Sequence, residues 1–253
     1  MNGKRVIVTG ASSGIGFQTA KRFADEGAQV VACGRNETAL GSLRDECSGM
    51  KGSIRLHLAD LRKTSQIERL VSESVEALEG IDILVNSAGI IGSGSIESTS
   101  IEDWDRMMGI NLRSAFLLTQ RSVPFLKEHK GSVVNVSSVA GPRAFPNLLA
   151  YCVSKAGIDQ LTRCAALELA VYGIRVNAVN PGVVVSNLHK RSGMDDKRYA
   201  EFLEHSKSTH PLGRVGKPEE VADLILYLSS DSASWITGGT FEIDGGRAQT
   251  CAR

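Results

Sequence analysis

The segment Gly10-Ala11-Ser12-Ser13-Gly14-Ile15-Gly16 directly follows the apolar run Val6-Ile7-Val8. This pattern predicts a buried strand that turns sharply, through glycines, into a helix. The first turn of a helix has unpaired N–H groups and the positive end of the helix dipole, and glycines allow a phosphate to approach both closely. The segment contains no Asp or Glu that would repel an anion. It therefore predicts a phosphate-binding turn.

Two sharper templates fit the same residues. Gly10-Ala11-Ser12-Ser13-Gly14 satisfies the G-x-S-x-G pattern of hydrolases, in which the serine is a nucleophile between a strand and a helix. Gly10, Gly14 and Gly16 also form a stretched variant of the dinucleotide-binding fingerprint. A nucleophilic serine needs an oxyanion-hole loop earlier in the chain, and only nine residues precede Gly10. Position favours the nucleotide, with the hydrolase and a purely structural turn as alternatives.

Short β-branched runs alternate with longer amphipathic stretches, which is typical of β-α-β units. We predict a single-domain α/β Rossmann fold over residues 1–253, with a doubly wound, seven-stranded parallel sheet and helices on both faces. The predicted strands are Arg5-Thr9, Gln29-Cys33, Ile54-Leu58, Ile83-Asn86, Ser132-Ser137, Arg175-Asn180 and Thr240-Ile243. The predicted helices are Ile15-Glu26, Glu37-Cys47, Thr64-Leu78, Ile101-His129, Tyr151-Val171 and Pro218-Ser229.

Residues 187–213 interrupt this alternation with charged and small residues and a short predicted helix around Lys197-Ser206. A polar insertion after the carboxyl end of a strand is where an α/β enzyme places a substrate lid. We therefore predict a lid over residues 187–213.

Composition argues against several functions. Lys and Arg number 29 against 28 Asp and Glu, so the net charge of +1 gives no electrostatic reason to bind nucleic acid or an anionic membrane. No uncharged apolar run reaches membrane-spanning length, and the first strand begins too early to leave room for a signal peptide. The histidines lack metal-binding spacing, so no metal site is expected. An odd number of cysteines without C-x-x-C spacing fits reduced thiols in a cytoplasmic protein: Cys33, Cys47, Cys152, Cys164 and Cys251.

Three polar residues form a candidate catalytic group. Tyr151 and Lys155 are four residues apart at the start of a predicted helix, so their side chains project from one face. Ser138 follows the apolar run Val133-Val134-Asn135-Val136 and therefore lies at the carboxyl end of a strand. That end is the ligand-binding edge of a parallel sheet.

With these motifs the sequence resembles the short-chain dehydrogenase/reductase family over essentially its whole length. The similar motifs are Thr9-Gly10-x-x-x-Gly14-x-Gly16, Asn111, Ser138, Tyr151-x-x-x-Lys155, and Pro181-Gly182 after Asn180. The resemblance implies an NAD(P)-dependent oxidoreductase that interconverts a secondary alcohol and a ketone by hydride transfer, and a homotetramer or homodimer. It makes Asn111, Ser138, Tyr151 and Lys155 the catalytic residues.

The resemblance also implies a set of cofactor-binding residues: Gly10, Ser12, Ser13, Gly14, Ile15, Gly16, Arg35, Asp60, Leu61, Asn86, Ala88, Gly89, Tyr151, Lys155, Pro181, Gly182, Val184 and Ser186. One departure is Ser87, where the family usually has a second asparagine. Serine still forms hydrogen bonds, so we expect only a local adjustment.

Family membership would give each catalytic residue a role. Tyr151 exchanges a proton with the substrate oxygen, Ser138 hydrogen-bonds that oxygen, and Asn111 helps to relay protons through water. Tyrosine titrates near pH 10, so we expect a nearby cation to lower its pKa. Lys155 is placed to be that cation, and it would also hold the nicotinamide ribose.

Cofactor preference is expected to depend on the end of the second strand. Gly34 stands where NAD-dependent relatives carry aspartate, and Arg35 follows it. Absence of the acid and presence of an arginine both favour NADP(H) over NAD(H), because arginine pairs with a 2′-phosphate. NAD(H) stays possible, since the glycine loop contains no basic residue.

The expected substrate is a small alcohol or carbonyl compound with apolar bulk. The residues predicted to line its pocket are Val139, Ala140, Phe145, Pro146, Leu148 and Val183, together with the lid over residues 187–213. An alternative is a catalytically silent NADP-binding sensor or scaffold, against which the joint retention of the four catalytic residues argues. Oligomerisation would use the predicted helices Ile101-His129 and Tyr151-Val171, the second of which carries the small residues Cys164-Ala165-Ala166.

Overall fold

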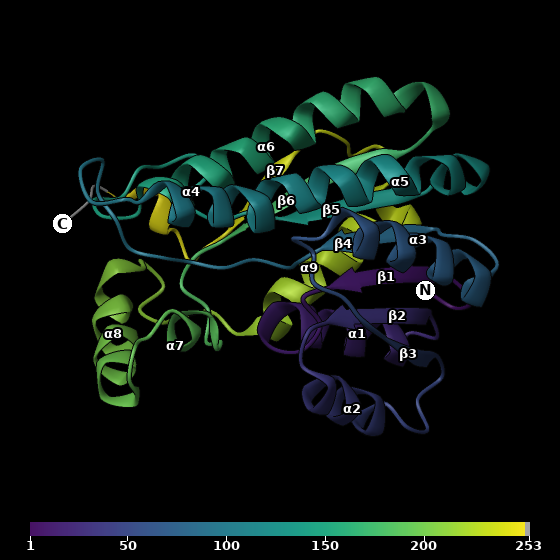
Figure 1. Ribbon diagram of the computed structural model, residues 1–253. Coiled ribbons are helices and arrows are strands. Elements are labelled where there is room, and N and C mark those ends of the chain that lie inside the picture. Colours follow the sequence, from purple (N-terminus) through teal and green to yellow (C-terminus); the bar gives the residue numbers. More distant parts are fainter. Residues whose placement is uncertain (251–253) are drawn as a thin grey trace.

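The computed structural model describes residues 1–250 and confirms the predicted fold. Seven parallel strands form one sheet in the order β3-β2-β1-β4-β5-β6-β7 (Figure 1). The chain reverses direction across the sheet between β1 and β4, and such a switch point opens a crevice at the carboxyl ends of the strands. The strands are β1 (Arg5–Thr9), β2 (Gln29–Gly34), β3 (Ser53–Leu58), β4 (Ile83–Asn86), β5 (Ser132–Val136), β6 (Arg175–Pro181) and β7 (Thr240–Ile243).

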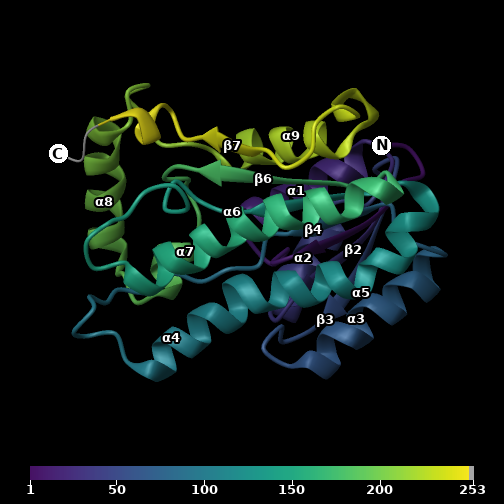
Figure 2. The same cartoon turned by 90° about the horizontal axis from the view of Figure 1, so that it is seen from above.

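Helices cover both faces of the sheet (Figures 1 and 2). Helices α1, α2 and α9 lie on one face, and α3, α4, α5 and α6 lie on the other. Their bounds are α1 (Gly14–Asp25), α2 (Glu37–Glu46), α3 (Thr64–Leu78), α4 (Ile101–Met108), α5 (Ser114–His129), α6 (Leu149–Leu169), α7 (Leu188–Arg191), α8 (Asp196–Thr209) and α9 (Pro218–Ser229).

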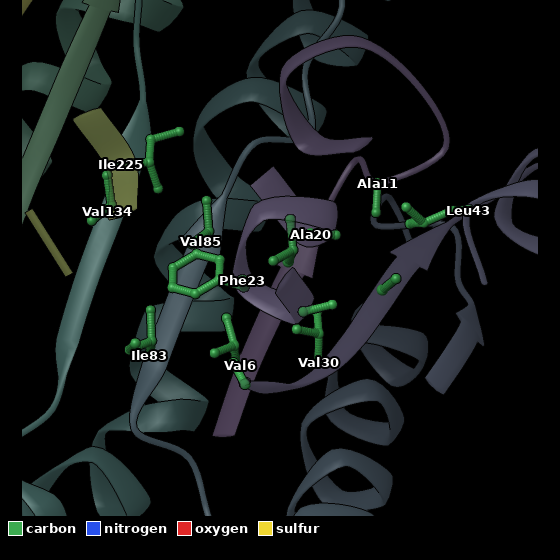
Figure 3. Close-up of a cluster of buried hydrophobic side chains, with 14 of the residues drawn as sticks. Val6, Ala11, Ala20, Phe23, Val30, Leu43, Ile83, Val85, Val134 and Ile225 are labelled. Atoms are coloured by element: carbon green, nitrogen blue, oxygen red, sulfur yellow. The ribbon is translucent and has the colours of Figure 1, made fainter. Parts of the chain in front are cut away.

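The central strands β1, β2 and β4 are largely apolar because both of their faces are buried, whereas the edge strand β3 alternates exposed residues with buried or half-buried ones. Along β1, Val6 and Val8 pack into the cluster under α1 and α9, whereas Ile7 packs into the cluster on the opposite face. Phe23 of α1 and Ile225 of α9 fill the first cluster against these strands (Figure 3). The two-sided core fixes where each strand ends, and with it the positions of the loops at the carboxyl edge.

The prediction of one helix over 101–129 is wrong in one respect. A π-helical turn, Gly109–Arg113, separates α4 from α5. Asn111 lies in this turn, and its side chain accepts from the Ile90 N–H (2.8 Å) and donates to the Ile90 carbonyl (3.0 Å). The wider turn directs Asn111 toward a loop from another strand, and π-helical turns often occur at functional sites.

The predicted lid region forms two helices instead of one. Helix α7 follows β6 after a short loop, and α8 is longer than the predicted segment Lys197-Ser206. Its N-terminus is fixed by Asp195, whose side chain accepts from the Arg198 N–H at 2.8 Å. Both helices lie together at one end of the molecule, beyond the carboxyl edge of the sheet (Figure 1).

Residues 1–250 contain neither a membrane-spanning helix nor a metal-binding cluster. Within residues 1–250, no helix is both long and apolar enough to cross a membrane. The same residues contain no group of three or more His, Cys, Asp and Glu side chains placed to hold a metal ion. Cys33, Cys47, Cys152 and Cys164 are free thiols, and Cys251 lies outside the described residues.

Candidate active site

The glycine turn after β1 has a backbone that only glycine adopts easily. Gly10 and Gly14 have φ values of +69° and +57°. A Cβ on Gly10 would lie 2.8 Å from the Ala88 Cα, and a Cβ on Gly16 would lie 2.5 Å from the Gly10 carbonyl oxygen. The three glycines therefore let the turn pack against the loop after β4 and against itself.

The N-terminus of α1 faces the crevice as a phosphate cradle. Ser13 is the N-cap but makes no side-chain capping bond, and the first turn of α1 contains no acidic residue. Gly14, Ile15 and Gly16 line the crevice, where their N–H groups and the helix dipole favour an anion. A Cβ on Gly14 would lie 3.1 Å from the Ser186 Cβ, so this glycine also keeps the cradle open. These features fit the pyrophosphate of a dinucleotide.

One cleft at the carboxyl edge of the sheet brings the predicted residues together, and it encloses about 240 Å³. Those that line it are Gly10, Ser13, Gly14, Ile15, Gly16, Gly89, Ser138, Tyr151, Lys155, Pro181, Gly182, Val184 and Ser186. They come from the ends of β1, β4, β5 and β6 and from α6. Segments far apart in the sequence thus meet at the edge where parallel sheets bind ligands.

Ser138 and Tyr151 are neighbouring buried residues in this cleft, with 8 % and 7 % of their surfaces exposed. Ser138 Oγ accepts from the Ala140 N–H at 3.1 Å, which holds the hydroxyl at the carboxyl end of β5. Burial raises the pKa of Tyr151, and the adjacent Ser138 hydroxyl acts in the opposite direction. The phenol is therefore protonated at neutral pH and is available as a proton donor.

Lys155 lies one helical turn after Tyr151 and is 5 % exposed. Its Nζ donates to the Val136 carbonyl at 2.8 Å and is 5.8 Å from the centre of the Tyr151 ring. Burial lowers the pKa of Lys155 to about 8. The expected lowering of the Tyr151 pKa by Lys155 is absent from this structure, because burial of the phenol dominates and the ammonium is held by a carbonyl.

Two predicted asparagines support the cleft without lining it. Asn111 Nδ2 donates to Ser154 Oγ at 3.0 Å in addition to its bonds with Ile90, so it ties the π-helical turn to α6 and to the loop after β4. Asn86 Nδ2 donates to Asn135 Oδ1 at 2.9 Å between β4 and β5. The side chain of Asn86 therefore joins two strands.

The remaining predicted cofactor residues lie beside the cleft, toward β2 and β3. A Cβ on Gly34 would lie 3.2 Å from the Ser12 side chain, and Arg35 is exposed next to it. Asp60 forms an ion pair with Arg62 at 2.6 Å, which holds the pKa of the carboxyl down at about 2. Leu61 is buried in the core, and Ala88 packs against that core and the glycine turn.

The apolar part of the cleft agrees closely with the predicted pocket. Val139, Ala140, Phe145, Leu148 and Val183 line it. Pro146 was expected there, but it is exposed and outside the lining, because the chain turns outward between Phe145 and Leu148.

The cleft is also lined by four residues of the predicted lid: Leu188, His189, Arg191 and Phe202. Sequence reasoning missed Ile90, Ile91, Val136, Ser137 and Arg247, and it named Ser87 only as a departure from the family pattern. The first four adjoin predicted site residues at the ends of β4 and β5, whereas Arg247 reaches the cleft only through the packing of the segment after β7.

Comparison with known proteins agrees with this geometry. Residues 10–248 match the family model described as enoyl-(acyl carrier protein) reductase. The 3-oxoacyl-[acyl-carrier-protein] reductase of Thermotoga maritima is 41 % identical over 97 % of this chain and 98 % of its own. Glucose 1-dehydrogenase of Gluconobacter oxydans is 37 % identical, over 96 % and 91 %. A short-chain dehydrogenase/reductase of unknown function from Caenorhabditis elegans, solved with cofactor, superposes with a TM-score of 0.93 at 35 % identity, covering 99 % and 97 % of the two chains.

The fold and site thus define a nicotinamide-dependent oxidoreductase of the Rossmann type, acting on alcohol or carbonyl groups. The chain belongs to the short-chain dehydrogenase/reductase family.

Proposed function

We propose that this protein reduces the carbonyl group of a small molecule with NADPH, and that Tyr151 is the general acid. The observation that carries the proposal is the placement of Ser138, Tyr151 and Lys155 in one buried cleft beside the phosphate cradle of α1. A bound nicotinamide cofactor supplies the hydride, and the protein supplies orientation and proton transfer.

The proton chemistry follows from the state of each group. The Tyr151 hydroxyl is protonated and donates its proton to the carbonyl oxygen as negative charge develops there. The Ser138 hydroxyl donates a hydrogen bond to the same oxygen and so stabilises that charge. Lys155, one turn away, places a positive charge beside the phenolate that remains. Asn111 keeps Ile90 and Ser154 in place around these groups.

A preference for NADPH is proposed from the end of β2. An aspartate in place of Gly34 would bring its Cβ within 3.2 Å of the Ser12 side chain and would repel a 2′-phosphate. Arg35 forms no ion pair with any residue of the described range 1–250, so its guanidinium is free to bind that phosphate.

The names of the relatives cover several classes of substrate. Their names include 3-oxoacyl-[acyl-carrier-protein] reductase, glucose 1-dehydrogenase and cyclohexanol dehydrogenase, the last from Acinetobacter at 36 % identity. The apolar lining around Phe145 and Leu148 supports a substrate with apolar bulk.

A homotetramer or homodimer is proposed from exposed apolar side chains on and just after α5 and α6. Leu167 and Val171 are 83 % and 79 % exposed, and Phe116, Val153 and Tyr172 are also exposed. A second copy would bury this surface. A cytoplasmic location is also proposed, because the cysteines of the described residues are free thiols.

Two other functions can be tested in the same assay. A catalytically silent binder would need the cradle but not Ser138 and Tyr151. A hydrolase would need Ser12 at the site of reaction, but Ser12 packs toward Gly34 and lies outside the cleft lining.

The test is a fluorescence titration with NADPH and NADH, followed by a panel of ketones and aldehydes with NADPH. We expect tighter binding of NADPH and oxidation of NADPH by some members of the panel. Binding without oxidation by any carbonyl would favour the silent binder. Ester cleavage that a Ser12→Ala substitution abolishes would favour the hydrolase.

A further inference from the structure

Arg247 lies at the apolar end of the cleft, although it is separated from the glycine turn by most of the chain. It follows β7, lines the cleft, and places its guanidinium 5.4 Å from the centre of the Phe145 ring. One of its Nη atoms donates to Thr209 Oγ1 at the end of α8. Figure 2 shows the C-terminal segment beside α8. The arginine is thus held between the lid and the loop that follows Ser138.

The turn that carries Arg247 is fixed independently of its guanidinium. Arg143 Nη1 donates to the carbonyls of Arg247 and Ala248, at 2.9 and 2.8 Å. The carboxylate of Asp244 accepts from the N–H groups of Gly246 and Ala248, at 2.8 and 2.6 Å. Asp244 therefore has backbone partners of its own, and the side chain of Arg247 remains directed at the cleft.

Two arginines at this end of the cleft have no carboxylate beside them in the cleft lining. Within residues 1–250, the lining includes Arg191 and Arg247 and no Asp or Glu. Burial lowers the pKa of His189, which also lines the cleft, so this histidine adds no charge at neutral pH. Across residues 1–250, neither Arg191 nor Arg247 forms an ion pair. Burial and the nearby charge of Arg143 lower the pKa of Arg247, and the charge of Asp244 opposes them. A half-buried guanidinium that forms no direct ion pair carries a desolvation penalty that a bound anion would offset.

We propose that Arg247 binds an anionic group of the substrate, a carboxylate or a phosphate, with Arg191 contributing from α7 at the rim. This inference rests on the proposed function and names the substrate class: an oxo acid, its phosphate counterpart, or the corresponding hydroxy compound. In the bound substrate, the anionic group would lie at Arg247 and the reacting carbon at Tyr151 and Ser138. The apolar body between them would lie along Phe145. The planar guanidinium, stacked on Phe145, offers its remaining N–H groups to two oxygens at once.

The location of Arg247 separates this role from cofactor binding. The phosphate cradle is formed by Gly14, Ile15 and Gly16 at the start of α1, whereas Arg247 contacts Phe145 and the lid helix α8. Loss of the Arg247 charge should therefore weaken the binding of anionic substrates and leave NADPH binding intact.

The test uses the full chain saturated with NADPH and three unreactive probes that share a phenylethyl group: 3-phenylpropanoate, 2-phenylethyl phosphate and 3-phenylpropanamide. Isothermal titration calorimetry measures each dissociation constant. We expect one of the two anions to bind at least about tenfold more tightly than the neutral amide, and the tighter one identifies the anion. Equal binding of all three would overturn the proposal.

Substitutions assign the effect to residues. Arg247→Gln should abolish the preference for the anion, Arg247→Lys should retain part of it, and Arg191→Gln should reduce it a few-fold. Arg198→Gln is the matched control, because Arg198 is an exposed cation of α8 that lies outside the cleft lining. An anion preference that survives in Arg247→Gln, or a loss of NADPH affinity in that variant, would contradict the proposal. Failure of the unsubstituted protein to bind NADPH would instead contradict the proposed function.

Discussion

The amino edge and the carboxyl edge of the sheet, where the strands begin and end, differ in how their polar groups are satisfied. At the amino edge, Asp82 accepts from the Arg5 backbone N–H, Nε and Nη2, each at 2.8 Å, and its own N–H and C=O pair with β1 and β5. At the carboxyl edge, the start of α1 is uncapped and the cations around Arg247 have no carboxylate partner within residues 1–250. Polar groups satisfied by the fold stabilise it, whereas groups left unsatisfied are available to a ligand. Substitutions at the two edges should therefore have separable effects.

The largest effect is expected at the amino edge. Asp82→Ala should lower the free energy of unfolding by about 3–5 kcal/mol, because it leaves the half-buried Arg5 unpaired. Urea denaturation measures this loss. Asp45→Ala is the control, since Asp45 forms only an exposed pair with Arg44 and should change stability by less than about 1 kcal/mol. A large change in NADPH affinity for Asp82→Ala, at temperatures where it is folded, would contradict the separation of the edges.

The second-largest effect is expected on NADPH affinity, from a substitution in the phosphate cradle at the start of α1. Gly16→Ala would bring a Cβ within 2.5 Å of the Gly10 carbonyl oxygen, so it should displace the turn. We expect NADPH affinity to fall about 100-fold, equivalent to about 2.7 kcal/mol, by fluorescence titration.

Gly41→Ala is the matched control for Gly16→Ala. Gly41 also lies in a helix, α2, but a Cβ there would meet no atom within 4 Å. It should stabilise the protein by about 0.5–1 kcal/mol and leave NADPH binding unchanged. If both variants bind NADPH normally, the close packing of the turn is not required for binding.

A smaller effect is expected at Arg35. Arg35→Gln should lower the affinity for NADPH about tenfold, equivalent to about 1.4 kcal/mol. It should leave the affinity for NADH unchanged, because only NADPH carries the 2′-phosphate. Arg44→Gln removes an exposed cation of α2 and should affect neither cofactor. Equal weakening of NADPH and NADH by Arg35→Gln would show that Arg35 does not select the cofactor.

The smallest effect is a dependence of stability on pH at His210, which joins α8 to the loop after β6. Its Nε2 accepts from the Val183 N–H at 3.1 Å and its Nδ1 bonds the Ser206 carbonyl at 2.6 Å. Burial lowers the pKa of His210 and Arg247 acts in the same direction, whereas the bond to the Ser206 carbonyl and the charge of Asp244 oppose them. The stabilisation is thus present above the unfolded pKa of about 6.5 and is lost as pH falls through the lowered folded value.

Between pH 7 and pH 5, the His210 bonds should account for about 1 kcal/mol of lost stability. His210→Ala should remove this part of the pH dependence in urea denaturation. His205→Ala, which replaces an exposed histidine of α8, should retain it. An unchanged pH dependence in His210→Ala would show that another group titrates.

The structural features predicted most accurately are those that depend on residues close together in the sequence. The strand ends lie within one residue of the prediction, since each apolar run is bounded by turn residues. The π-helical turn at Asn111 was missed because it depends on hydrogen bonds to Ile90, 21 positions away. Arg247 was missed because packing, not sequence proximity, brings it to the cleft. The Tyr151 pKa was predicted in the wrong direction for this structure, since burial of a side chain cannot be read from a motif.

The most direct test of the central claim is the rate of NADPH oxidation by Tyr151→Phe with a carbonyl that the unsubstituted protein reduces. Phenylalanine keeps the buried ring and removes only the hydroxyl beside Ser138. We predict a fall in kcat of at least about 1,000-fold, with NADPH affinity within a few-fold of the original. Retained turnover in Tyr151→Phe would show that the proton comes from another group and would contradict the proposed role of this site.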